Sequence, residues 1–76
     1  MMDLKFIELI AKELEIDKDK ILPEAKLDED IGWDSMDAIS IMSAIDDEYN
    51  IQLDEEKFSK IITIKDIYDL VKLDNS

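Results

Sequence analysis

The chain has 76 residues, of which 46% are hydrophobic, and it carries a formal net charge of −12. This length leaves room for one domain, residues 1–76, and the apolar content excludes a disordered acidic tail, which has too few apolar residues to form a core. The absence of cysteine and histidine excludes disulfide bonds, thiolate metal sites and catalysis by a histidine base.

The first predicted element is a helix over residues 3–15. Apolar residues recur there at helical spacing, with charged residues such as Lys5 and Glu8 between them. The apolar residues are Leu4, Ile7, Ile10, Ala11 and Leu14. We expect the face that they form to pack against the core.

A long loop is predicted over residues 16–34, because the helical period ends there and Asp17, Pro23 and Gly32 interrupt the chain. Scattered apolar side chains are expected to hold the loop against the core. They are Ile16, Ile21, Leu22, Leu27 and Ile31. Structureless loops longer than about 12 to 15 residues are uncommon in compact domains and are often functional. This one leads directly to Ser35.

A second helix is predicted over residues 35–49. One apolar stripe runs along it and is expected to face the core, and its members are Ala38, Ile41, Met42, Ile45 and Tyr49. Met36 and Ile39 fall outside this stripe, beside Ser40, Ser43 and Asp47. Two interpretations of Met36 and Ile39 stay open: exposure near the helix start, or burial in a core that covers more than half of the helix.

Two further helices are predicted in the last third of the chain. Asp54 is a favourable N-cap for a short helix that ends at about residue 60. Thr63 and Asp66 resemble a capping box for a fourth helix that ends near residue 73. The residues of this helix that recur at helical spacing are Ile64, Ile67, Tyr68 and Val71.

These elements together predict an all-α fold, a small four-helix bundle with a long loop between helices 1 and 2 and a short third helix. No stretch shows the alternation of apolar and polar residues that is typical of strands. No apolar run approaches the roughly 20 residues that span a bilayer, and the start of the chain does not resemble a signal peptide. We therefore expect a cytoplasmic protein with no stable membrane insertion.

The negative charge is concentrated in the middle of the chain. Residues 27–56, called the acidic block below, contain eleven Asp or Glu and no Lys, whereas the remaining residues contain ten acidic residues and nine lysines. Such a block repels nucleic acids and attracts basic protein surfaces. We expect basic partner proteins and no binding of nucleic acid.

The most informative segment joins the long loop to the second helix. Gly32 permits backbone conformations that other residues avoid, Asp34 can cap the helix, and Ser35 then presents its hydroxyl at the helix N-terminus. A phosphate at this position would meet free backbone amides and the positive end of the helix dipole. Taken alone, the same residues also suit a simple loop end with an N-cap and no chemistry.

The segment LPEAKLDEDIGWDSMD, together with DDEYNIQL and TIKDIYDLV downstream, resembles the acyl carrier protein family over nearly the whole chain. The attachment motif of that family is usually Asp-Ser-Leu after a loop that contains glycine. Asp34, Ser35 and Met36 match this motif with one conservative change. The resemblance implies that a phosphopantetheinyl transferase attaches 4′-phosphopantetheine from coenzyme A to Ser35, with Asp34 flanking the arm, which makes the chain a phosphoprotein.

The resemblance also implies that the chain is a carrier and not an enzyme. It would hold acyl groups as thioesters for fatty acid biosynthesis or related lipid metabolism, without a metal site, as a monomer. Its partners would be acyl-transfer and chain-modifying enzymes with basic docking surfaces. The implied docking residues on the second helix are Met36, Asp37, Ile39, Ser40, Ser43 and Asp47.

Two positions depart from the pattern of many fatty-acid carriers. An acidic residue often stands where this chain has Ser40, and a small or acidic one stands where it has Trp33. A specialised carrier for polyketide, aminoacyl (D-alanyl type) or nonribosomal peptide pathways is therefore an alternative. Trp33 has two interpretations, an anchor for the loop or a lid over the arm, and a lone tryptophan is more often an anchor.

Three other functions fit the residues less well. A calcium-binding loop centred on Gly32 would require Leu27, Ile31 and Ala38 at ligand positions, and these cannot bind calcium. A catalytic serine at Ser35 lacks both a histidine base and a Gly-x-Ser-x-Gly elbow. An acidic interaction module without a cofactor would account for the charge but leaves the long loop unexplained.

Overall fold

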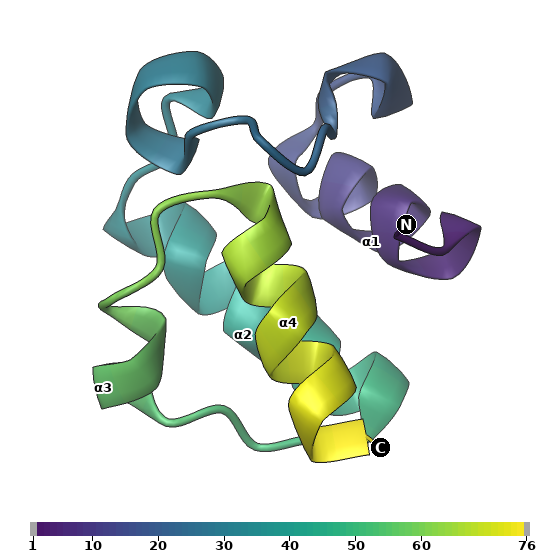
Figure 1. Cartoon of the computed structure of the whole chain (residues 1–76), viewed down its shortest axis with the longest axis vertical. Coiled ribbons are helices and arrows are strands. Elements are labelled where there is room, and N and C mark those ends of the chain that lie inside the picture. Colours follow the sequence, from purple (N-terminus) through teal and green to yellow (C-terminus); the bar gives the residue numbers. More distant parts are fainter. Residues whose placement is uncertain (1, 76) are drawn as a thin grey trace.

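The computed structural model describes the backbone of residues 2–75 and the side chains of residues 2–72. Four α-helices, α1 (Leu4–Leu14), α2 (Ser35–Tyr49), α3 (Glu55–Phe58) and α4 (Ile64–Asn75), follow one another in the chain, and two short helical segments, η1 (Lys18–Lys20) and η2 (Leu27–Ile31), lie between α1 and α2 (Figure 1). Over these residues there is no β-strand, only an isolated bridge between Lys26 and Thr63. The all-α fold is confirmed.

α1 begins at its N-cap Asp3, whose carboxylate accepts a hydrogen bond from the Phe6 N–H at 2.9 Å. Ile10 and Ala11 are buried as predicted, but Leu4 is 61% exposed. Phe6, which the apolar pattern missed, is fully buried and meets Tyr68 edge to face at 4.9 Å between ring centroids. The prediction for Leu4 was wrong because the buried face of α1 is the one that contains Phe6 and Ile10, and Leu4 lies on nearly the opposite side of the helix from Phe6.

α2 is the central helix, since it contacts both α1 and α4. In Figure 1, α4 crosses in front of it and α1 lies to one side. Ile41 and Ile45 are fully buried, and the remaining predicted stripe residues pack partly buried against the core. Met36 and Ile39 are 70% and 59% exposed, so the first of their two interpretations is correct.

The loop between α1 and α2 is held against the core, as expected. Ile21, Ala25 and Leu27 are buried, whereas Leu22 is 48% exposed. Backbone hydrogen bonds tie the loop to the start of α4, because the Leu27 N–H donates to the Ile62 carbonyl at 2.9 Å and the Ile64 N–H donates to the Ala25 carbonyl at 3.1 Å. The loop therefore depends on contacts with residues nearly forty positions further along the chain.

The segment η2 is a π-helical turn that the sequence pattern did not predict. The Asp30 carboxylate accepts from the Lys26 N–H at 2.8 Å at its start. At its end, the N–H groups of Gly32 and Trp33 both donate to the Leu27 carbonyl, at 2.8 and 3.0 Å. Gly32 adopts a left-handed conformation with φ of 74°, which lets the chain leave the turn and enter α2.

The last two helices begin close to the predicted positions. Asp54 caps α3 through the Glu56 N–H at 2.9 Å, and α3 ends at Phe58, two residues before the predicted end. The Ser59 hydroxyl there donates to the Glu56 carbonyl at 2.7 Å, which competes with continuation of the helix. α4 continues to Asn75, beyond the predicted end. No helix within residues 2–75 is long and apolar enough to cross a bilayer.

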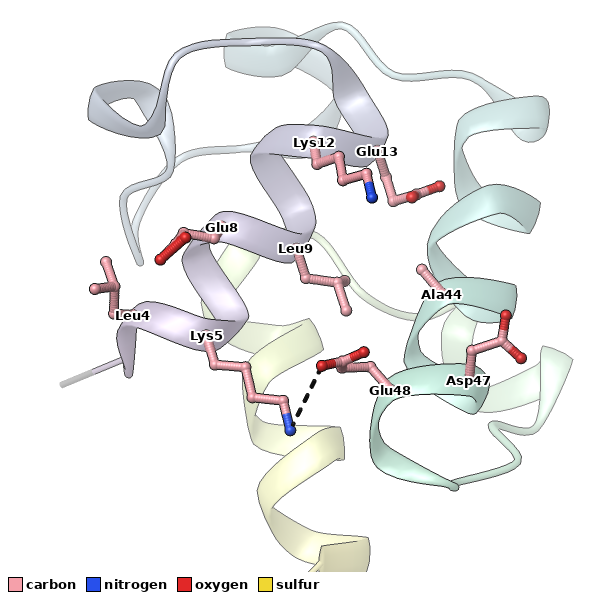
Figure 2. A pocket seen from close by; sticks show the side chains of 9 residues that line it. All are labelled: Leu4, Lys5, Glu8, Leu9, Lys12, Glu13, Ala44, Asp47 and Glu48. Atoms are coloured by element: carbon pink, nitrogen blue, oxygen red, sulfur yellow. Dashed lines mark ion pairs between the residues drawn. The ribbon is translucent and has the colours of Figure 1, made fainter.

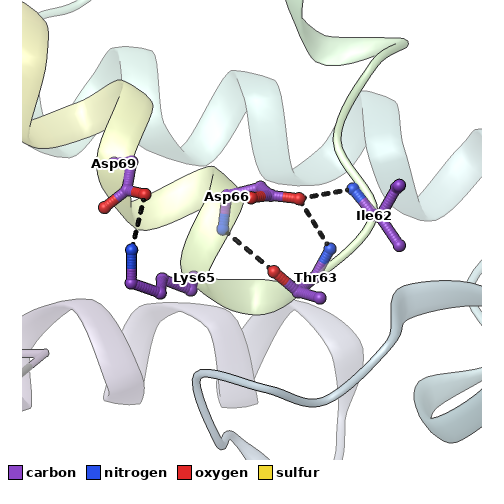
Figure 3. A network of polar contacts seen from close by, with 5 residues as sticks. All are labelled: Ile62, Thr63, Lys65, Asp66 and Asp69. Carbon is purple, nitrogen blue, oxygen red and sulfur yellow. Dashed lines mark hydrogen bonds and ion pairs between the residues drawn. The ribbon is translucent and has the colours of Figure 1, made fainter.

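The capping box predicted for α4 is confirmed (Figure 3). The Asp66 carboxylate accepts from the Ile62 N–H at 2.8 Å and from the Thr63 N–H at 3.1 Å, and the Asp66 N–H donates to the Thr63 hydroxyl at 3.3 Å. These backbone hydrogen bonds stabilise the carboxylate and lower the pKa of Asp66. The network fixes the connector that receives the Leu27 hydrogen bond, and so it also supports the loop before α2.

Candidate functional site

Ser35 is the first residue of α2 and its side chain is exposed. The residue before it, Asp34, is the N-cap, as predicted, and has an extended backbone. The Asp37 N–H donates to Asp34 Oδ1 at 3.0 Å, and the Asp34 N–H donates to Asp37 Oδ2 at 3.2 Å. The two aspartates thus form a reciprocal capping box around the first turn, with Ser35 between them.

The first turn of α2 keeps two hydrogen-bond donors beside Ser35. Within the part of the chain that the structure describes, the N–H groups of Ser35 and Met36 have no acceptor, and Ser35 Oγ has no hydrogen-bond partner. Free amides at the positive end of a helix dipole favour an anion. The site therefore suits a phosphodiester on Ser35 Oγ, with the hydroxyl open to solvent and two donors next to it.

The loop that carries Ser35 is fixed on its other side by an aromatic contact. Trp33 is partly buried, and its ring lies 5.8 Å from that of Phe58 in α3, between centroids, with the planes tilted by 45°. This contact supports the interpretation of Trp33 as an anchor. A Cβ at Gly32 would meet no atom within 4 Å, so the requirement at Gly32 comes from its backbone conformation and not from lack of space.

The predicted docking residues divide into two groups. One shallow hollow of about 340 Å³ beside α2 is lined by Ile39, Ser40, Ser43 and Asp47. Met36 and Asp37 do not line it. Met36 is exposed next to Ser35, and Asp37 is partly buried, with its carboxylate bound to the Asp34 N–H.

Sequence reasoning missed two residues of this hollow, Glu13 of α1 and Ala44 of α2. The periodicity of one helix does not predict this, because the hollow forms where α1 packs against α2.

The carboxylates of the acidic block lie on the surface. Asp37 is partly buried and the other ten acidic residues of the block are exposed. Among the described residues, lysines outside the block form ion pairs with Glu29 at 3.4 Å, Glu48 at 3.7 Å and Glu56 at 4.0 Å. Within residues 2–72 the remaining carboxylates of the block have no such partner, so the region around α2 presents uncompensated negative charge to solvent.

Comparison with known proteins gives consistent matches. The family described as "Phosphopantetheine attachment site" matches residues 5–71. The acyl carrier protein of Syntrophobacter fumaroxidans is 35% identical over 68 residues, covering 90% of this chain and 84% of the relative. That of Treponema denticola is 34% identical over 68 residues (90% and 87%), and that of Thermosynechococcus vestitus is 30% identical over 63 residues (83% and 78%).

The family match runs from α1 through Ser35 and α2 into α4, so it includes every element that positions the serine. The resemblance of the loop and the first turn of α2 to this family is thereby confirmed. The chain belongs to the acyl carrier protein family, whose members are carriers and not enzymes and hold 4′-phosphopantetheine as a covalent cofactor.

Proposed function

We propose that this protein carries acyl groups as thioesters on a 4′-phosphopantetheine arm attached through a phosphodiester to Ser35 Oγ. The observation that carries the proposal is the exposed Ser35 hydroxyl at the start of α2, within the Asp-Ser-Met motif of a chain that matches the phosphopantetheine attachment family. The chain contains no cysteine, so a thiol that bears an acyl group has to come from the cofactor.

The residues of the first turn each contribute to this attachment. Ser35 supplies the oxygen that becomes part of the phosphodiester, and the N–H groups of Ser35 and Met36 are available to the phosphate. Asp34 and Asp37 hold the turn through their reciprocal hydrogen bonds. The arm itself supplies the terminal thiol on which an acyl group is carried.

The partners of the proposed carrier are the phosphopantetheinyl transferase and the enzymes that load, modify and transfer the acyl group. The exposed carboxylates of the acidic block support docking to basic surfaces of these enzymes, because opposite charges steer association. The docking residues that we propose on α2 are Met36, Asp37, Ile39, Ser40, Ser43 and Asp47.

For the pathway, we propose fatty acid biosynthesis or related acyl-chain synthesis in the cytoplasm, with the protein acting as a monomer. The three relatives are acyl carrier proteins, which supports acyl cargo over aminoacyl or peptidyl cargo. A specialised carrier is the alternative, because Trp33 and Ser40 depart from the pattern of many fatty-acid carriers.

The attachment site is tested by incubating the apo protein with coenzyme A and a phosphopantetheinyl transferase and measuring the intact mass. We expect the mass of one arm to be added to the wild type and to Ser59→Ala, a control that alters an exposed serine outside the proposed docking residues. Ser35→Ala should gain nothing. An equal gain in Ser35→Ala, or no gain in the wild type, would contradict the proposal.

A further inference from the structure

A second, larger hollow lies between α1 and α2 and has a volume of about 560 Å³ (Figure 2). Leu9 of α1 and Ala44 of α2 lie between the two helices in this view, and the small side chain at position 44 leaves the space open. Glu13, Ala44 and Asp47 line both this hollow and the one beside Ile39. The two hollows therefore form one depression, called the α1–α2 groove below.

Each of the two hollows is lined by an exposed apolar side chain. Leu4, 61% exposed, lines the larger hollow, and Ile39, 59% exposed, lines the smaller one. Leu9 is partly buried between them. Along α2 the groove extends from Ile39 to Glu48, about 14 Å at 1.5 Å per residue, which matches two to three turns of a second helix laid against it.

The charges of the groove are unbalanced. Glu8 and Glu13 of α1 and Asp47 of α2 line it, and none of the three takes part in an ion pair within residues 2–72. Lys5 is already engaged, since its ammonium group lies 3.7 Å from the Glu48 carboxylate and 4.8 Å from the centroid of the Tyr49 ring. Unpaired carboxylates thus stand on both helices around an apolar centre.

From this arrangement we infer that the α1–α2 groove binds a basic amphipathic helix of a partner protein. Apolar residues of that helix, spaced at i, i+3 or i+4 and i+7, would cover Leu9 and Ala44, and its lysines or arginines would face Glu8, Glu13 and Asp47. The docking surface then includes α1 and not only the outer side of α2. The inference rests on the proposed function only in assigning this helix to an enzyme that handles the acyl group.

Lys12 also lines the groove, and it has no ion pair within residues 2–72. It would oppose a basic helix, because two like charges close together repel each other. Substitutions at Lys12 and at the acidic positions should therefore change the affinity in opposite directions. Lys12→Glu should strengthen binding, and Glu13→Lys should weaken it.

The test is a titration of the isotope-labelled protein with a synthetic helix of about 14 residues, followed by backbone amide chemical shifts. The peptide carries leucines at i, i+3, i+4 and i+7 and lysines elsewhere, and a scrambled peptide of the same composition serves as the control. We expect saturable shifts around Leu9 and Ala44 with the amphipathic peptide. Equal binding of the scrambled peptide, or shifts around Met36 alone, would overturn the inference.

Three variants compare the groove with charge at another site. Glu8→Lys and Glu13→Lys should each weaken the peptide about tenfold, whereas Glu24→Lys, the same change at an exposed loop position outside the groove, should change affinity less than about twofold. Far-ultraviolet circular dichroism verifies that each variant is folded. If Glu24→Lys weakened peptide binding as much as the groove variants do, binding would depend on the net charge of the protein and not on the groove, which would overturn the inference. Groove amides that shift with protein concentration without peptide would assign the groove to a second copy of the chain.

The outcome is independent of the attachment site. Ser35→Ala should bind the peptide with the affinity of the wild type although it accepts no arm. Peptide binding without a mass gain in the wild type would contradict the role of Ser35 alone. A mass gain without peptide binding would contradict the role of the groove alone.

Discussion

Asp34 and Asp37 each accept a hydrogen bond from the backbone of the other, at 3.0 and 3.2 Å, and enclose Ser35 between them. The two carboxylates accept from the N–H groups of Asp37 and Asp34, whereas those of Ser35 and Met36 have no acceptor among the described residues. The negative residues beside Ser35 therefore have a structural role in starting α2 at residue 35. Their charge does not by itself identify them as docking residues.

Asp34→Ala removes the N-cap of α2 and should lower the free energy of unfolding by about 1 kcal/mol, because the first turn loses its side-chain acceptor. Urea denaturation followed by circular dichroism measures the change. Asp46→Ala, at an exposed position of the same helix without a capping bond, is the control and should change stability by less than about 0.5 kcal/mol. Equal stability of the two variants would contradict the capping role.

Asp66→Ala should lower the free energy of unfolding by about 1 to 2 kcal/mol at neutral pH, because two backbone N–H groups lose their acceptor. The pKa of Asp66 is lower in the folded state than in the unfolded state, so its contribution is complete above the unfolded pKa and is lost as pH falls through the folded one. The difference between variant and wild type should therefore shrink in acid.

The control for Asp66 is Asp69→Ala, which removes an exposed ion pair with Lys65 at 3.0 Å within the same helix. Exposed pairs contribute about 0 to 1 kcal/mol, so this variant should be less destabilised than Asp66→Ala. Urea denaturation at several pH values measures both. If the difference in unfolding free energy between Asp66→Ala and the wild type stayed constant down to strongly acidic pH, the lowered pKa of Asp66 could not explain its contribution.

Tyr49→Phe should raise the free energy of unfolding by about 1 kcal/mol, because the buried Tyr49 hydroxyl has no hydrogen-bond partner among the described residues. Burial, with the nearby charge of Asp3, raises the pKa of Tyr49 from 10.0 to about 12. The folded state therefore keeps this proton when the unfolded state loses it, and stability should fall as pH rises from 10 to 12.

Thermal unfolding of Tyr49→Phe and of the wild type over that pH range tests this expectation. The loss of stability at high pH should be smaller in Tyr49→Phe, because this variant lacks the hydroxyl whose pKa is raised in the folded state. Parallel profiles, or a variant less stable than the wild type at neutral pH, would contradict the description of Tyr49.

Features that depend on neighbours in sequence were predictable. The capping residues Asp34, Asp54 and Thr63 and the bounds of α2 follow from side-chain chemistry and helical period within a few residues. The role of Gly32 was also predictable, because its positive φ is required by the turn in which it lies and by no distant contact. The position of Ser35 at the helix start was thus available from the sequence.

Features that depend on distant contacts were not predictable. Phe6 lies in the core and Leu4 does not, because the orientation of α1 places Phe6 against Tyr68, which is more than sixty residues further along the chain. The π-helical turn η2 is held by a hydrogen bond from Leu27 to Ile62. The α1–α2 groove likewise lies where Ala44 of α2 faces Leu9 of α1. The periodicity of one helix does not predict which residues of the other helix it faces.

The most direct test of the carrier function is fragment mass spectrometry of the protein purified from its native host. We predict an acyl-phosphopantetheine group on the fragment that contains Ser35, with the acyl part released by neutral hydroxylamine, as a thioester requires. A modified fragment that contains Ser59 but not Ser35, or an acyl group that resists hydroxylamine, would contradict the proposed attachment and its chemistry.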